Sequence, residues 1–167
     1  MKELTKHLEA LARIELAHNR IVDWLTALGI LLAVAFVTRA IQRVVMKRLA
    51  RAAEATSTEV DDVFVDVMAG TRLSFHLALG LFVAQYLLEL SRKADRIVYL
   101  ALVVLVGIQV GIWAQRAASG VIRLWSSGRE GRQDATLAAG LRFIAKLVIW
   151  TLVLLVVMSN LGIQIGA

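Results

Sequence analysis

The sequence predicts an all-α, polytopic membrane protein in which four transmembrane helices form two helical hairpins. Hydrophobic residues make up 59% of the 167 positions, and long apolar stretches fill most of the chain. The clearest stretch, residues 97–115, has no charged side chain and as a helix is about 28 Å long, close to the roughly 30 Å hydrocarbon core of a bilayer. The alternative, a soluble four-helix bundle, needs a polar face on every helix, and this stretch has almost none.

The four helices are expected at about residues 21–38, 73–90, 97–115 and 143–163. The first and second reach full length only if charged side chains at their ends extend to the headgroups. The last apolar stretch runs from residue 147 to 167 without a charge. We therefore expect the chain to continue beyond residue 167.

Three segments are expected along the chain. Residues 1–20 hold an amphipathic helix at the outer membrane face, with Leu4, Leu8 and Leu11 on one side, although a helix packed on the other helices is an equal alternative. Residues 21–96 form one helical hairpin, and residues 97–167 form the second.

Neither an enzyme nor a cofactor is expected. The chain has no cysteine, which excludes disulfides and thiolate metal sites. It contains no phosphate loop, no nucleophile elbow and no His-Glu-x-x-His. Asp61, Asp62 and Asp66 are better explained as acids that favour a helix start than as metal ligands, because no other oxygen ligands are seen to converge with them.

The net charge of +6 indicates contact with anionic lipid headgroups, because the basic residues cluster at helix ends. The nucleic-acid partner that a soluble basic protein would suggest is not expected. Lys and Arg are more numerous in the two long connections than at the opposite ends of the helices. The positive-inside rule then places both connections in the cytoplasm and both chain ends outside.

Basic side chains recur every fourth residue after the first apolar stretch. Like charges at this spacing cost a few tenths of a kcal/mol per pair in an isolated helix, whereas an anionic surface returns about 1 kcal/mol per basic residue. The simpler interpretation is a positive-inside anchor, and the sharper one is a lipid-contacting lever that couples this helix to the state of the membrane. The residues at this spacing are Arg39, Arg43, Lys47 and Arg51, and Arg48 lies beside them. We call these five residues the basic ridge.

Small residues and two isolated basic groups complete the candidates. Gly107 and Gly111 form a Gly-x-x-x-Gly pair that predicts close helix packing without naming the partner. His76 and Lys146 each lie about one turn inside a helix end, where snorkelling to the surface is the preferred account over an intramembrane functional group. Each follows a Gly-x-Arg triplet at the same spacing, which suggests a weak internal repeat.

The chain resembles the MscS family of small-conductance mechanosensitive channels. The residues that carry the resemblance are Asp-Ala-Thr-Leu at 134–137 and Ser-Asn-Leu-Gly-Ile-Gln-Ile at 159–165. The segment Thr-Glu-Val-Asp-Asp-Val at 58–63, with the amphipathic stretch and membrane helix after it, looks like larger members with extra N-terminal helices. The resemblance implies that residues 97–167 are the sensor hairpin and that residues 21–96 are peripheral.

The resemblance also implies the function. It makes Leu161, Gly162, Ile163 and Gln164 the turn into a glycine- and alanine-rich pore helix, although that helix and the cytoplasmic vestibule are missing here. The chain would be the tension-sensing paddle of an ion channel that opens under bilayer tension for osmotic protection. The channel would be a homo-oligomeric ring in the bacterial inner membrane, with ions passing through the whole assembly.

Two other functions are weighed against the channel. The alternative is a small four-helix membrane adaptor or accessory subunit that binds partner helices through its Gly-x-x-x-Gly pair. A Gly/Ala-rich helix after residue 167 would favour the channel, and a natural stop there would favour the adaptor. A secondary transporter would need broken helices or a charge at the membrane midplane, and the sequence indicates neither.

Overall fold

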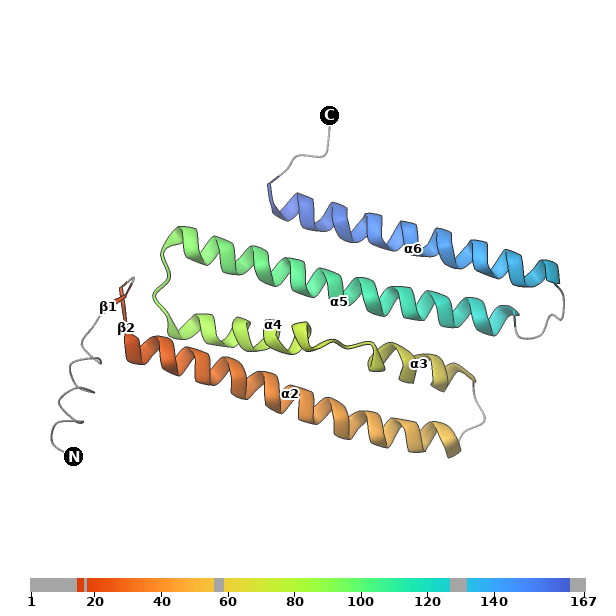
Figure 1. Ribbon diagram of the computed structural model, residues 1–167, viewed down its shortest axis with the longest axis horizontal. Coiled ribbons are helices and arrows are strands. Elements are labelled where there is room, and N and C mark those ends of the chain that lie inside the picture. The colour runs from red at the N-terminus through yellow and green to blue at the C-terminus, as the bar shows by residue number, and fades with distance from the viewer. Residues whose placement is uncertain (1–14, 17, 56–58, 127–131, 163–167) are drawn as a thin grey trace. The chain divides into compact units, whose positions relative to one another are not determined.

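The computed structural model is helical, as the sequence predicts (Figure 1). It describes residues 15–16, 18–55, 59–126 and 132–162, with side chains for 18–51, 61–126 and 135–162. A two-residue strand pair precedes the helices. The elements are β1 Glu15–Leu16, β2 Asn19–Arg20, α2 Ile21–Ala55, α3 Glu59–Ala69, α4 Leu73–Ala84, the 3-10 helix η1 Gln85–Leu87, α5 Arg92–Ser126 and α6 Arg132–Asn160.

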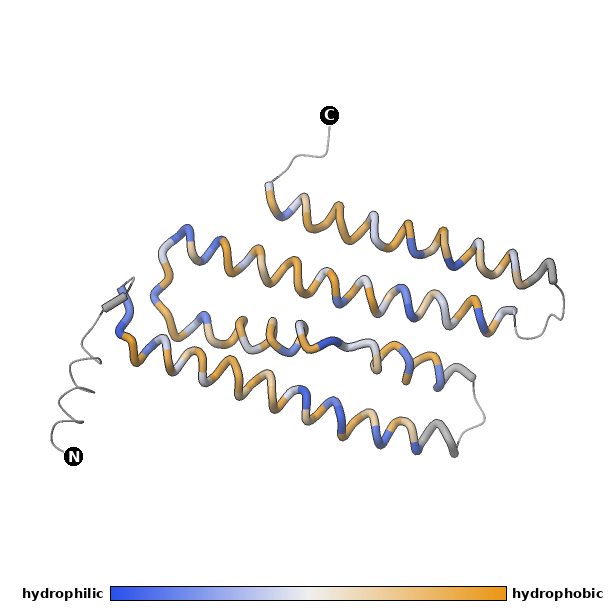
Figure 2. The backbone as a smooth tube through the Cα atoms, in the orientation of Figure 1, coloured by the Kyte–Doolittle hydropathy of each residue, from blue (hydrophilic) through white to orange (hydrophobic). Residues whose placement is uncertain are grey.

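Three described helices are long and apolar enough to cross a membrane, which makes the chain compatible with an integral membrane protein. They cover Ile21–Arg51, Arg92–Ser126 and Ala135–Asn160, and Figure 2 shows their long apolar runs in orange. A fourth span is obtained only if α3 and α4 are counted together as one broken span. The interruption between them, at Gly70–Arg72, was not predicted as a break within a span.

Helix α5 is longer than the apolar stretch that predicted it. It begins at Arg92 and ends at Ser126, because hydropathy marks only the apolar part of a helix and not its polar ends. The Ser91 hydroxyl oxygen accepts a hydrogen bond of 3.3 Å from the Ala94 amide, and Asp95 lies in the first turn. Both features stabilise a helix start.

The strand pair replaces the last residues of the predicted amphipathic helix, most of which lies outside the described residues. Glu15 pairs with Arg20 and Leu16 with Asn19, antiparallel, and His18 adopts a left-handed φ of 69° at the reversal. Residues 15–16 and 19–20 of the predicted amphipathic segment are therefore strand, and the rest of that prediction stays a prediction. A short polar stretch between apolar elements readily forms a turn.

Two compact units make up the chain. One comprises residues 1–39 and 73–102, and the other comprises residues 40–72 and 103–167. The boundaries between the units fall within α2 and within α5, so the units do not correspond to the three predicted segments. Those segments stay a prediction. Each unit is described separately below.

In the first unit, small residues bring α2 and α4 close together. A Cβ atom built on Gly80 would collide with the backbone of Leu31, because no side chain separates the two helices there. Ala27, Ala35 and Ala78 are buried nearby in sequence on the same two helices. Close approach of helix backbones through small side chains is the usual packing of helices in lipid.

In the second unit, α5 contacts α3 in the same way. A Cβ on Gly120 would lie 2.5 Å from a methyl group of Val63, which is itself buried. The Gln42 side chain of α2 donates a hydrogen bond of 3.1 Å to the Met68 carbonyl near the end of α3. Both contacts hold the short helix α3 against longer helices.

We predict that Gly80→Ala destabilises the folded protein, because the added methyl group meets backbone that cannot rotate away. Overpacking of this kind costs about 1–3 kcal/mol, which exceeds the roughly 1 kcal/mol that alanine gains in helix propensity. Gly29→Ala is the matched control, since no atom lies within 4 Å of a Cβ at that position. Thermal unfolding in detergent would show a lower midpoint for Gly80→Ala alone, and equal midpoints would contradict the packing described.

Candidate functional site

The break between α3 and α4 is the most elaborately bonded part of the described chain. Three side chains of α5 reach it, from Gln109, Trp113 and Arg116. Their spacing of four and then three residues places them on one face of α5. We call these three residues, with the chain segment 66–72 that they contact, the break cluster.

Gln109 bonds the two backbone groups that the break releases. Its Oε1 atom accepts a hydrogen bond of 2.9 Å from the Arg72 amide, and its Nε2 atom donates one of 3.3 Å to the Gly70 carbonyl. The side chain is 1% exposed, the largest fully buried side chain described. An amide is suited to this position because it offers a donor and an acceptor together.

Trp113 and Arg116 bond the same segment on either side. The Trp113 indole donates to the Thr71 hydroxyl oxygen at 3.1 Å, and that hydroxyl donates to the Met68 carbonyl at 2.8 Å. The Arg116 guanidinium donates to the Asp66 carbonyl at 2.9 Å and to its carboxylate at 3.0 Å. Broken backbone at membrane depth is tolerated only where such groups are satisfied.

Gly70 is required at the break for a steric reason. A Cβ at this position would lie 2.6 Å from the Cδ and Nε atoms of Arg116, in the middle of that side chain. The Gly70 amide still bonds back to the Asp66 and Val67 carbonyls, which ends α3 in a tight turn. The glycine therefore lets the Arg116 side chain pass over the end of α3 to Asp66.

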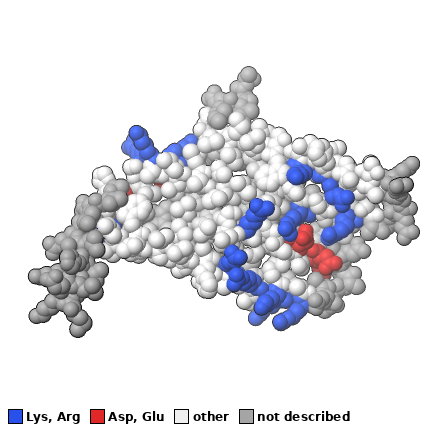
Figure 3. Space-filling view, viewed as in Figure 1, with Lys and Arg blue, Asp and Glu red and all other residues white. Residues whose placement is uncertain are grey.

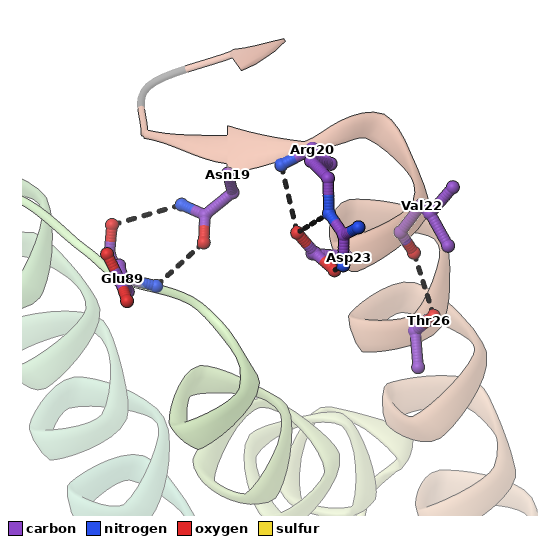
Figure 4. A network of polar contacts seen from close by, with 6 residues as sticks. All are labelled: Asn19, Arg20, Val22, Asp23, Thr26 and Glu89. Atoms are coloured by element: carbon purple, nitrogen blue, oxygen red, sulfur yellow. Dashed lines mark hydrogen bonds and ion pairs between the residues drawn. The ribbon is translucent and has the colours of Figure 1, made fainter. Parts of the chain in front are cut away.

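Polar contacts also join separate elements of the first unit. The Nδ1 atom of His76 lies 3.1 Å from the Thr38 hydroxyl oxygen, and His76 is 4% exposed. Its predicted snorkelling to the surface was therefore wrong, because the side chain is buried against a hydroxyl of a neighbouring helix. Figure 4 shows the second contact, where the Asn19 amide bonds both backbone groups of Glu89 at 2.8 and 3.0 Å.

The basic ridge lies along α2 with its outer four side chains exposed and Arg39 half-buried. Among the described residues, the two ion pairs are Arg20 with Asp23 and Arg116 with Asp66, so no ridge residue is paired within that part of the chain. Figure 3 shows Lys and Arg side chains at the surface on the face it draws. The ridge is thus a row of mostly exposed cations along α2.

Gly107 and Gly111 face α6. A Cβ on Gly107 would lie 3.4 Å from Val157, and one on Gly111 would lie 3.1 Å from Val153 and 3.6 Å from Trp150. The pair therefore lies at an interface within the chain. At the far end of α6, Leu161 and Gly162 form a turn, with Gly162 at a φ of 81°, while the predicted turn residues Ile163 and Gln164 lie outside the described residues.

The break cluster was missed from the sequence, although a signal for it was present. Gln109 is the only side chain with both an amide donor and an acceptor inside the apolar run before Gln115, and Trp113 and Arg116 share its helical face. A lone amide in such a run indicates a backbone group elsewhere that lacks its helical partner.

We predict that Gln109→Leu destabilises the break and exposes its amides. The substitution leaves the Arg72 amide and the Gly70 carbonyl without partners, at about 1–3 kcal/mol for each buried group. Hydrogen–deuterium exchange should show faster exchange at the Arg72 amide. Thermal unfolding in detergent should show a lower midpoint. Gln85→Leu, which removes one exposed bond to the Phe82 carbonyl, should change neither; equal behaviour of the two variants would refute the role of Gln109.

Comparisons with known proteins supply no assignment for this site. No protein-family description, curated protein or solved structure matches the chain. The arguments for its function therefore come from its own residues, above all from the apolar exterior of its helices and the polar contacts at the break.

Proposed function

We propose that this chain is the lipid-facing, tension-sensing region of a mechanosensitive channel of the MscS type. The observation that supports this best is the exterior of α6. None of the residues in its most apolar window is buried within the chain. Large apolar side chains such as Leu147, Leu152 and Val156 are more than half exposed. Such a helix needs lipid or other helices around it, and the residues that resemble the family lie at its two ends.

The mechanism requires no catalytic group. Tension favours the conformation with the larger in-plane area, and thinning of the bilayer changes the hydrophobic mismatch around exposed helices. A lipid shifts the equilibrium only by the difference in its affinity for the two conformations. In the proposal, α5 and α6 form the sensor hairpin, α2 and the broken α3–α4 span form the peripheral one, and the gate belongs to a ring of identical subunits through which ions pass.

The proposed orientation follows from the distribution of basic residues. Both long connections lie in the cytoplasm of a bacterial inner membrane, and the N-terminus lies outside. The basic ridge then faces the anionic headgroups of the cytoplasmic leaflet. Osmotic protection is the physiological role that goes with a pore opened by tension.

A membrane adaptor is the second candidate, and the exposed face of α2 favours it. Leu25, Leu32 and Phe36 are each more than half exposed and could contact a partner helix. The Gly107/Gly111 pair is already taken up by α6, so an adaptor would need this other face. The transporter is less favoured even though the chain bends by 65° between α3 and α4, because Gln109 bonds the released backbone groups and leaves neither to a substrate.

The channel proposal is tested by electrophysiology on the protein as it occurs in its cell. The intact mass is measured first, and a value above 18.3 kDa shows how much chain accompanies these residues. The purified protein is then reconstituted in liposomes and patched under suction. Current steps whose open probability rises with tension support the proposal. A bilayer that stays silent up to lysis, with the protein present in it, refutes it.

We predict that neutralising the four basic-ridge residues that recur every fourth position shifts the gating threshold. Arg39, Arg43, Lys47 and Arg51 are replaced by glutamine, which removes an attraction of about 1 kcal/mol per residue to anionic headgroups. The pressure for half-maximal opening should shift by more than its variation between patches. The shift should be smaller in liposomes that lack anionic lipid.

The matched control replaces Arg92 and Lys93, which are exposed at the other end of the spans. Its threshold should stay close to that of the unaltered protein. An unchanged threshold in the ridge variant, at normal expression, would leave the ridge as a simple topological anchor.

A further inference from the structure

A pocket of about 370 Å³ lies in the second unit beside the break cluster. One wall comes from the break itself, through Arg72. A second wall comes from α5, through Ile112, Gln115 and Arg116, and a third comes from one turn of α6, through Lys146 and Trp150. All three walls belong to the same compact unit, so the pocket is formed within it.

Three cations converge on this pocket, and only one of them has a partner among the described residues. Arg116 is paired with Asp66 at 3.0 Å. Within that part of the chain, neither Arg72 nor Lys146 has a carboxylate within ion-pair distance. Cations that line one pocket repel each other, and a bound anion removes that repulsion while accepting their hydrogen bonds.

The walls of the pocket are held by hydrogen bonds that do not use the charged groups of Arg72 and Lys146. The Arg72 amide is bonded to Gln109 at 2.9 Å, so the backbone that carries its guanidinium is anchored. The Trp150 indole donates to the Gln115 side-chain oxygen at 2.8 Å, which ties α6 to α5 across the pocket. Preorganised donors bind more tightly because little side-chain freedom is lost on binding.

The surroundings of the pocket select among anions. Lys146 and Trp150 lie on the helix whose neighbouring side chains Phe143 and Leu147 are each more than half exposed and apolar. Lys146 lies in the middle of α6 but at the start of its uncharged apolar part, and Trp150 lies one turn further along. Basic and tryptophan side chains at the edge of an apolar run are typical of the membrane interface. An anion with an attached acyl chain would place its charge in the pocket and its chain along this apolar exterior.

We propose that this pocket binds a phosphate ester, with Arg72 and Lys146 as the principal contacts and Arg116 as an additional donor. Guanidinium and ammonium groups are the usual partners of phosphate oxygens. An anionic phospholipid carries this group, and the pocket volume of about 370 Å³ leaves room for the glycerol beside it. The site is separate from the basic ridge and does not depend on the protein being a channel.

The test measures binding of phosphatidylglycerol to the full chain in detergent by native mass spectrometry, with phosphatidylcholine for comparison. Arg72→Gln and Lys146→Gln should each weaken phosphatidylglycerol binding about fivefold, the effect of one basic residue at an anionic surface. Arg142→Gln is the matched control, because Arg142 is exposed one turn away on α6 and does not line the pocket. It should change binding less than twofold.

The conservative variant Lys146→Arg keeps the charge and should keep the binding, even if Lys146→Gln fails to fold. A competition arm adds inorganic phosphate to the unaltered protein. Loss of lipid binding in the glutamine variants without competition by phosphate supports a lipid site. Binding of phosphate that the same variants abolish supports the same pocket with a soluble occupant. Equal lipid binding by all variants, or an equal loss in Arg142→Gln, overturns the proposal.

Discussion

The hydrogen bonds of Gln109 are the interaction on which the rest of the second unit depends. A backbone that leaves its helix in an apolar setting carries an amide and a carbonyl that lipid cannot bond. One buried amide side chain supplies both partners, at the Arg72 amide and the Gly70 carbonyl. The position of α5 next to α3 follows, because Gln109 reaches the break only if the two helices are close, and Gly120 against Val63 permits that approach.

Helix α5 contacts two neighbours, the break after α3 and helix α6, through different sets of side chains. The face with Gln109, Trp113 and Arg116 bonds the break through polar side chains. The face with Gly107 and Gly111 receives α6 through van der Waals contact with Val153 and Val157, and one hydrogen bond from Trp150 to Gln115 joins the same two helices. Close approach through small residues is thus combined with a polar contact on this side as well.

The sequence was sufficient for the helical class and for the three long apolar helices, because hydropathy is a local property. It was insufficient for contacts between helices. Gly70-Thr71-Arg72 and Gly140-Leu141-Arg142 have the same pattern, yet the first interrupts two helices and the second lies inside α6. The difference comes from side chains of α5 that bond only the first triplet. His76 was misjudged for the same reason, since its partner Thr38 belongs to another helix.

The contact of Asn19 with Glu89 has a consequence for the order in which the protein is made. The two residues are 70 positions apart, and the Asn19 amide bonds the backbone of Glu89 at both its donor and its acceptor. Asn19 therefore waits, during synthesis, until α2, α3 and α4 have all left the ribosome. The hydrogen bonds at the start of α2 can form only after the residues that follow α4 have been synthesised, so α2 completes its packing late in synthesis.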